Sequence, residues 1–117
     1  MDFNFTDQKF ENEYPKLIRD NIPVIYKERT GKEAKTEIIK EDEKFFRYLL
    51  KKMVEESEEA EYSIKTGNTL EELADVLEIV DTVLELKGWT WEEVKNMQAE
   101  KRLKNGGFEK RLILLEK

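Results

Sequence analysis

Two short acidic segments hold the residues of this sequence that could do chemistry. Residues 55–61 read EESEEAE, and residues 71–75 read EELAD. Residues three and four apart are neighbours on a helix, where each like-charged pair costs a few tenths of a kcal/mol. A divalent cation would neutralise such charges, and carboxylate oxygens are the ligands that Mg²⁺ and Mn²⁺ prefer. The two segments therefore indicate a candidate metal site.

The direction of each carboxylate follows from placing it on a helix that turns by about 100° per residue. In the first segment, Glu56 falls inside the apolar arc of the helix and Glu59 falls at its edge. In the second, Glu72 falls inside the apolar arc and Asp75 lies at its border. Each helix thus carries a pair of carboxylates spaced i, i+3, one directed toward the core and the other toward its rim. A cation would remove the cost of burying them unpaired.

A purely structural interpretation of the same residues stays open at this point. Glu55 and Glu58 are expected to point to solvent, and in a glutamate-rich chain such runs commonly form only a solvated helix face. Glu72 could also complete a capping box, Thr-x-x-Glu, that begins at Thr69. Capping does not account for Glu56 or for the second matching pair.

Long helices are expected to position these pairs. The spacing of apolar residues predicts a helix over 42–65, which Gly67 stops. A second helix is predicted from the capping box at Thr69 to Gly88. Thr90 opens a third with the same pattern, and a Gly-Gly pair ends it. The fold expected is an all-α antiparallel helix bundle.

Smaller elements are predicted around the long helices. Pro23 fits the first turn of a short helix that ends near Gly31. Residues 35–40 and 108–117 are each compatible with a short strand, and the two could pair. The bundle could therefore carry one small two-stranded β element.

Composition limits the class of protein. The 117 residues are enough for one domain, expected over 14–117, with 1–13 as a tail or arm. The net charge of −6 argues against nucleic-acid polymers as partners, because these require a basic surface. No apolar run is long enough to span a membrane, and the first residues do not have the pattern of a signal peptide, so we expect no membrane contact and a cytoplasmic location.

The chain contains neither cysteine nor histidine. Disulfides, thiolate catalysis and zinc–thiolate sites are therefore excluded. The absence of histidine excludes Ser-His-Asp and Cys-His catalysis, and it argues strongly against a ferritin-like di-iron bundle. Hydrolytic chemistry would have to rest on carboxylates, lysines, tyrosines or a hard metal ion.

Four motifs in order resemble a known family. E-E-x-x-E at 55–59 is followed by E-x-x-D at 72–75, while YPKLIRDNIP (14–23) and NGGFEKR (105–111) flank them. This order resembles the MazG-like all-α nucleoside triphosphate pyrophosphohydrolase superfamily, in particular its phosphoribosyl-ATP pyrophosphohydrolase-like branch. The resemblance covers roughly 14–113.

The resemblance implies roles for individual residues. The positions that match the family's Mg²⁺ ligands are Glu56, Glu59, Glu72 and Asp75. The positions that match phosphate contacts or the N-terminal signature are Lys101, Asn105, Lys16 and Arg19. Asn105 stands where many relatives have arginine, and the last two could instead fix the N-terminal segment. Glu55 or Glu59 would accept the proton of the attacking water.

The implied reaction is Mg²⁺-dependent cleavage of a nucleoside triphosphate, with Mn²⁺ as a possible substitute, into a monophosphate and pyrophosphate. Its biological use would be the house-cleaning of a non-canonical nucleotide. Hydrolysis of phosphoribosyl-ATP in histidine synthesis is an alternative that the motifs do not separate. An alternative of another class is an acidic helical interaction module with a degenerate site.

A second copy of the chain is the expected partner. The helix over 70–87 has more apolar surface than one neighbour can cover, and family members of this size are usually dimers or tetramers. Five aromatic residues could stack on the base of the substrate or belong to the core or the interface: Phe45, Phe46, Tyr48, Trp89 and Trp91.

Overall fold

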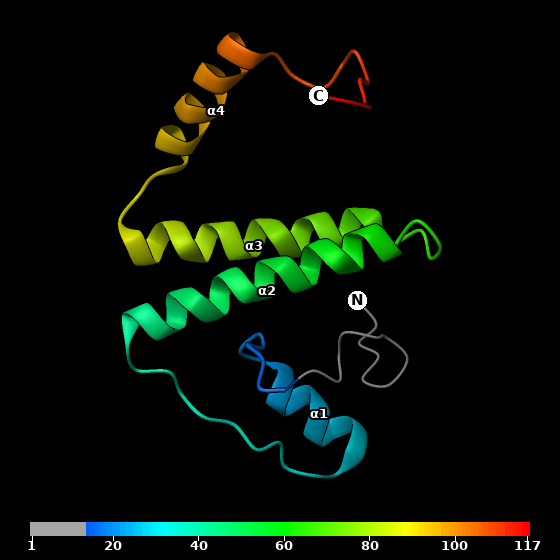
Figure 1. Cartoon of the computed structure of the whole chain (residues 1–117). Coiled ribbons are helices and arrows are strands. Elements are labelled where there is room, and N and C mark those ends of the chain that lie inside the picture. The colour runs from blue at the N-terminus through cyan, green and yellow to red at the C-terminus, as the bar shows by residue number, and fades with distance from the viewer. Residues whose placement is uncertain (1–13) are drawn as a thin grey trace.

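Four α-helices joined by irregular segments make up residues 14–117, the part of the chain that the computed structural model describes (Figure 1). They are α1 (Ile22–Thr30), α2 (Asp42–Tyr62), α3 (Thr69–Lys87) and α4 (Trp91–Asn105). No strand forms within this range. The expectation of an all-α protein is confirmed for the described residues, and the tail or arm expected over 1–13 lies outside them.

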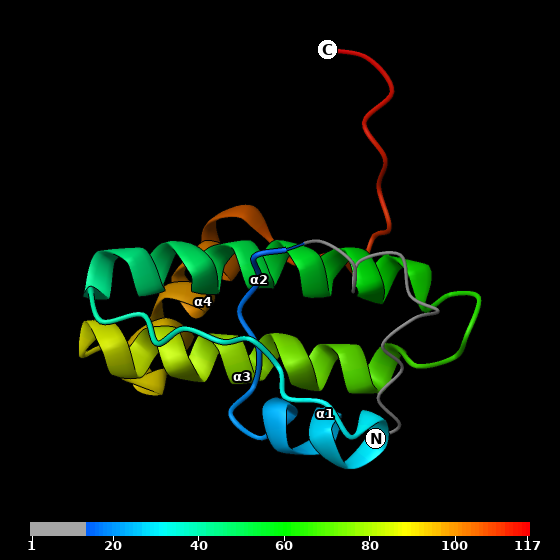
Figure 2. The same cartoon turned by 90° about the horizontal axis from the view of Figure 1, so that it is seen from below.

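Helices α2 and α3 run antiparallel and form the one extensive helix–helix contact within 14–117 (Figures 1 and 2). Leu49 of α2 and Ile79 and Leu84 of α3 are buried, and each contributes about 1.5–3 kcal/mol through loss of apolar surface. Near the end of α3, Lys87 Nζ lies 4.0 Å from the centre of the Phe46 ring on α2, which is a cation–π contact. This pairing brings the end of α2 beside the start of α3, where the two acidic segments lie.

The turn between the two helices is closed by Ser63, which is only 2% exposed. Its hydroxyl lies 2.5 Å from the carbonyl oxygen of Ala60 and 2.6 Å from Thr69 Oγ1 at the start of α3. Gly67 has a φ of 80° and donates its N–H to the Ser63 carbonyl at 2.8 Å. The positive φ suits glycine, and the turn fixes where α3 begins relative to α2.

The capping box predicted at Thr69 is wrong. Asn68 is the N-cap of α3 and makes no side-chain cap hydrogen bond, while Thr69 is already the first helical residue. The Thr69 hydroxyl contacts Ser63 instead, so capping by Thr69 does not explain Glu72. The box predicted at Thr90 is confirmed, because both reciprocal hydrogen bonds between Thr90 and the third helical residue are present.

The two short strands predicted at 35–40 and 108–117 are also wrong, since both segments are irregular. They lie on opposite sides of the α2–α3 pair (Figure 1), so neither can supply the other's backbone hydrogen bonds. A lone two-stranded hairpin is marginal in water even when its strands meet. The short helix predicted to end near Gly31 is confirmed as α1.

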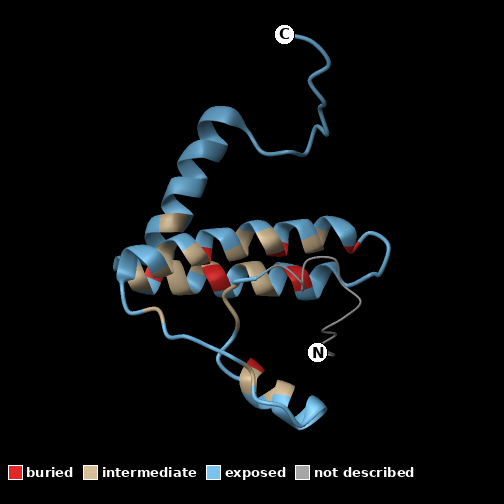
Figure 3. Ribbon diagram, turned by 60° about the horizontal axis from the view of Figure 1, so that its bottom comes forward, coloured by how far each residue is buried: buried red, intermediate tan, exposed pale blue. Residues whose placement is uncertain are grey.

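Helix α4 packs little against the rest of the described chain. Val94 is its single half-buried residue, and every other residue of the helix is exposed (Figure 3). The Trp91 indole N–H donates to Asp81 of α3 and ties the two helices together at their junction. Within the described residues, none of the helices combines the length and the apolar character that crossing a bilayer requires.

Candidate metal centre

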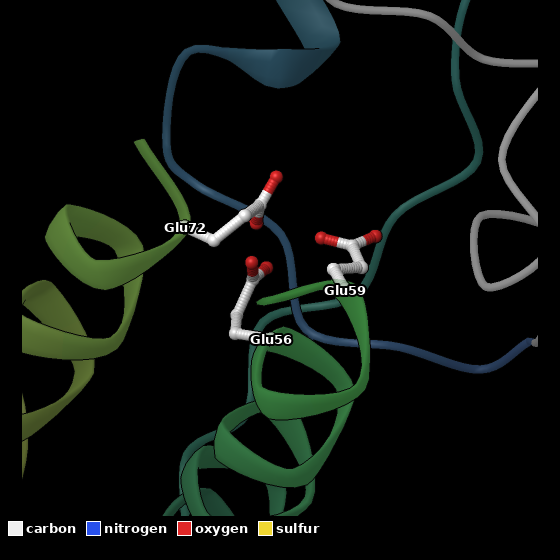
Figure 4. A group of neighbouring side chains, drawn as sticks. All are labelled: Glu56, Glu59 and Glu72. Carbon is white, nitrogen blue, oxygen red and sulfur yellow. The ribbon is translucent and has the colours of Figure 1, made fainter. Parts of the chain in front are cut away.

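Three carboxylates meet where the end of α2 lies beside the start of α3 (Figure 4). Glu56 and Glu59 project from α2, one helical turn apart, and Glu72 projects from α3. One oxygen atom from each side chain lies within 4.8 Å of the other two. This spacing lets one ion contact all three, so the structure brings together three of the four predicted ligands.

Burial makes this cluster different from a solvated acidic face. Glu56 and Glu72 are each only 7% exposed. The Oε2 atoms of both side chains are buried and have no hydrogen-bond partner within the described part of the chain. Leaving a buried acceptor unsatisfied costs about 1–3 kcal/mol, and more if it is charged. These two oxygens fit a hard cation, whose ligands are oxygen atoms.

The electrostatics of the cluster disfavour the ionised carboxylates. The pKa of Glu59 is raised to about 9, mainly because the side chain is buried. A hydrogen bond with Glu56 and repulsion between the two carboxylates raise this pKa further. Burial, followed by the same interactions with Glu56, raises the pKa of Glu72 to about 7. Without a cation, the cluster therefore tends to hold protons at neutral pH.

Asp75, the fourth predicted ligand, lies beside this cluster and already has a cationic partner. Arg19 Nη2 donates to Asp75 Oδ1 at 2.7 Å. Burial raises the pKa of Asp75 and the charge on Glu56 raises it further, whereas the hydrogen bond from Arg19 lowers it. Asp75 therefore belongs to the same electrostatic group as the three glutamates, but its negative charge is shared with an arginine.

Glu55 does not point to solvent as expected. Its side chain is 15% exposed, and Lys52 Nζ lies 3.4 Å from its Oε1 atom and 3.6 Å from Glu56 Oε1. The physical reason is the segment 14–17, which lies against this face of α2 and with it lines a cleft of about 240 Å³. A helical wheel of α2 alone cannot include that segment. Glu58 is exposed, as predicted.

The predicted phosphate contacts are spread over the molecule. Arg19 lies at the site, and Lys16 lines the cleft beside α2 with its ammonium 5.5 Å from the centre of the Tyr14 ring. Lys101 and Asn105 are exposed on α4. Helix α4 follows the C-terminal end of α3, whereas Glu72 lies near the N-terminal end of α3 (Figure 1). Within one chain the structure does not bring these two residues to the cluster.

The five aromatic residues predicted to contact the base, or to lie in the core or an interface, differ in their burial. Phe45, Phe46 and Tyr48 are half-buried on α2, and Trp89 and Trp91 are exposed around the start of α4. None of the five belongs to the carboxylate cluster.

Lys52 and Ser63 are site-shaping residues that the sequence prediction missed. Lys52 stands three and four residues before Glu55 and Glu56, the spacing of neighbours on a helix, so a search for opposite charges could have found it. Ser63 carries no such signal, because its partner Thr69 lies across a turn.

Residues 14–117 therefore form an all-α fold in which the α2–α3 pair holds a carboxylate cluster that could bind a divalent cation. Comparisons with protein-family models, with curated proteins and with solved structures found no match. Membership of the MazG-like superfamily therefore stays a prediction that rests on the four motifs of this sequence.

Proposed function

We propose that this chain is a Mg²⁺-dependent nucleoside triphosphate pyrophosphohydrolase, able to use Mn²⁺, that releases a nucleoside monophosphate and pyrophosphate. One observation carries the proposal: inside a cluster of three carboxylates, Glu56 and Glu72 each leave a buried oxygen atom that has no hydrogen-bond partner in the described residues. A divalent cation satisfies both atoms and neutralises the repulsion between them. The order of the acidic motifs supplies the reaction class.

The residues of the chain divide into three roles in this proposal. Glu56, Glu59 and Glu72 hold the ion. Asp75 becomes the fourth ligand once its carboxylate is no longer paired with Arg19. When bound, the ion polarises the phosphate and lowers the pKa of a water molecule. Glu55 or Glu59 accepts the proton of that water, which requires no histidine. Arginine and lysine side chains near the site stabilise the charge that develops on the leaving pyrophosphate.

The test is an assay of a panel of canonical and modified nucleoside triphosphates with Mg²⁺, in which the products are separated by chromatography. The proposal expects equal amounts of monophosphate and pyrophosphate. Release of orthophosphate without pyrophosphate would contradict the reaction class. The variant Glu72→Gln should lose the activity, because it replaces a buried oxygen ligand with an amide.

A matched control separates loss of the site from loss of charge in general. Glu71 is the immediate neighbour of Glu72 on α3 but is exposed. Glu71→Gln changes the net charge by the same amount and should keep full activity. Equal losses in the two variants would contradict a role for the buried carboxylate.

The rival class, an acidic helical interaction module, accounts less well for the burial. A basic partner binds exposed carboxylates, whereas Glu56 and Glu72 are almost fully withdrawn from solvent. The choice between house-cleaning and phosphoribosyl-ATP hydrolysis rests on the substrate, and direct comparison of the two substrates in the same assay decides it.

We also propose that the protein acts as at least a homodimer. Apolar side chains of α3 stay exposed along one stripe, at Leu70, Leu73 and Leu77, although α2 is already packed against this helix. Helix α4 adds exposed Met97 and Leu103. Contiguous apolar surface of this kind marks an interaction site, and a second copy would cover it.

A further inference from the structure

One ion pair ties the segment before α1 to the candidate metal centre. Arg19 Nη2 lies 2.7 Å from Asp75 Oδ1, although the two residues are 56 positions apart in the sequence. The Asp75 side chain is 14% exposed and the Arg19 side chain 49%. The guanidinium therefore reaches inward from the surface to a carboxylate beside the cluster.

Residues 14–17 of this segment lie against α2, and the residues that follow lead into α1. The Arg19 carbonyl accepts the N–H of Ile22 at 3.1 Å and so forms the turn that begins α1. Ile22 is the one buried residue of α1, and within 14–117 this helix makes no extensive contact with α2 or α3. Figure 4 shows the chain that leads into α1 passing beside the three glutamates. The ion pair therefore links this segment to α3.

We propose that Arg19 pairs with Asp75 only in the metal-free protein and that a metal ion displaces it. Metal binding would then release the segment 14–21 from α3. The inference rests on the proposed function, because it takes Asp75 as a ligand of the same ion as the glutamates. It adds a coupling between the occupancy of the site and the position of the N-terminal segment.

The physical basis is competition for one carboxylate. Arg19 already supplies a positive charge to Asp75 at 2.7 Å, and a metal ion would supply its charge to the same carboxylate. Mg²⁺ approaches a carboxylate oxygen to about 2.0–2.1 Å and carries twice the charge of a guanidinium group. An ion pair with a half-exposed partner is worth only about 1 kcal/mol or less. The ion therefore displaces the arginine from the carboxylate, and the guanidinium is released from α3.

Hydrogen exchange measures the release directly. The full-length protein is compared with and without saturating Mn²⁺, and peptides that cover 16–30 are followed separately from those of α2 and α3. The proposal expects Mn²⁺ to slow exchange in α2 and α3 but to speed it in 16–30. In Arg19→Gln, exchange of 16–30 should already be fast without metal and should not change when Mn²⁺ is added.

Metal affinity supplies the second readout. Titration of Mn²⁺ followed by calorimetry should show that Arg19→Gln binds roughly three- to tenfold more tightly than the wild type, because a competitor has been removed. Arg47→Gln is the matched control, since Arg47 pairs with exposed Glu43 at 2.9 Å elsewhere on α2. This variant removes the same charge and should bind Mn²⁺ within about twofold of the wild type.

The outcomes are distinguishable. Slower exchange of 16–30 on adding Mn²⁺, or an affinity of Arg19→Gln no higher than that of Arg47→Gln, would overturn the displacement while leaving the metal site intact. A wild-type protein that binds no Mn²⁺ would overturn both this inference and the proposed function.

Discussion

Glu56 on α2 and Glu72 on α3 face each other across the helix pair, and each keeps one carboxylate oxygen buried without a hydrogen-bond donor among residues 14–117 (Figure 4). Stability alone would favour replacing such a pair, because buried like charges repel one another and lose their hydration. Sites that are costly to folding but useful for binding are a common feature of functional proteins. The stability of the metal-free protein should therefore report on this cluster.

The first prediction concerns pH. The pKa of Glu59 is raised to about 9 and that of Glu72 to about 7 in the folded protein, whereas unfolded glutamates titrate near their ordinary value of about 4.3. Below that value both states are protonated, and above it the unfolded state loses its protons first. The free energy of unfolding should therefore fall as pH rises from about 4.5 to 9. Thermal melts in chelator at a series of pH values measure this.

Magnesium should reverse that trend, because only the deprotonated carboxylates bind the ion. At pH 8, saturating Mg²⁺ should raise the melting temperature by several degrees, and at pH 5 it should have little effect. A metal-free profile that is flat between pH 5 and 9, or a Mg²⁺ effect that is equal at both pH values, would contradict the assignment of the cluster.

The second prediction is that Glu56→Gln separates stability from function. The amide removes a buried charge and supplies donors to its two carboxylate neighbours, so the metal-free protein should gain about 1 kcal/mol at pH 8. The variant should lose the Mg²⁺-dependent rise in melting temperature, and pyrophosphate release should fall roughly 100-fold or more.

Glu58→Gln is the control for this variant, since Glu58 lies on the same helix and is exposed. It should change stability by no more than about 0.5 kcal/mol and should leave the Mg²⁺ effect unchanged. A Glu56→Gln protein that keeps its Mg²⁺ response would count against Glu56 as a ligand.

The third prediction concerns Ser63, whose hydroxyl joins the end of α2 to the start of α3. Ser63→Ala should cost about 1–2 kcal/mol. It should also weaken Mg²⁺ binding, because the turn sets the register that places Glu72 opposite the α2 carboxylates. Ser57→Ala, at an exposed position of α2, is the control. Chemical denaturation measures the first effect and calorimetric titration the second. A destabilised Ser63→Ala protein with unchanged affinity would show that the register does not depend on this hydroxyl.

The sequence was informative wherever a local pattern determines the structure. The helices follow from the spacing of apolar residues and from glycines such as Gly31 and Gly88, which adopt positive φ angles of 74° and 73° at the helix ends. The inward direction of Glu56 and Glu72 also follows from the 3.6-residue period of each helix, although the period alone did not decide between a metal site and a solvated face.

The contacts that the sequence could not predict are those between segments far apart in the chain. Nothing local indicates that Arg19 reaches Asp75, or that the segment 14–17 covers Glu55, because neither contact has a periodic signature. The capping pattern at Thr69 was misleading since its hydroxyl has a competing partner across the turn. At Thr69, a contact across the turn therefore overrides a local preference.

The fourth prediction concerns assembly. Leu73 and Leu77 lie one turn apart on α3 and are each about half exposed, at 52% and 53%. Stable dimers bury roughly 1,200–2,000 Å² in total, and such interfaces centre on apolar side chains. Light scattering after gel filtration should therefore give at least a dimer for the wild type. Leu77→Glu should shift the protein toward the monomer, because the dimer would bury an unpaired carboxylate.

Ile38→Glu tests whether any added charge has this effect. Ile38 is highly exposed in the irregular segment between α1 and α2, away from the α3 stripe, so this variant should keep the wild-type mass. Circular dichroism should show the same helix content for both variants, since neither replaces a buried residue. A monomeric wild type, or a Leu77→Glu protein with unchanged mass, would contradict an interface on this face of α3.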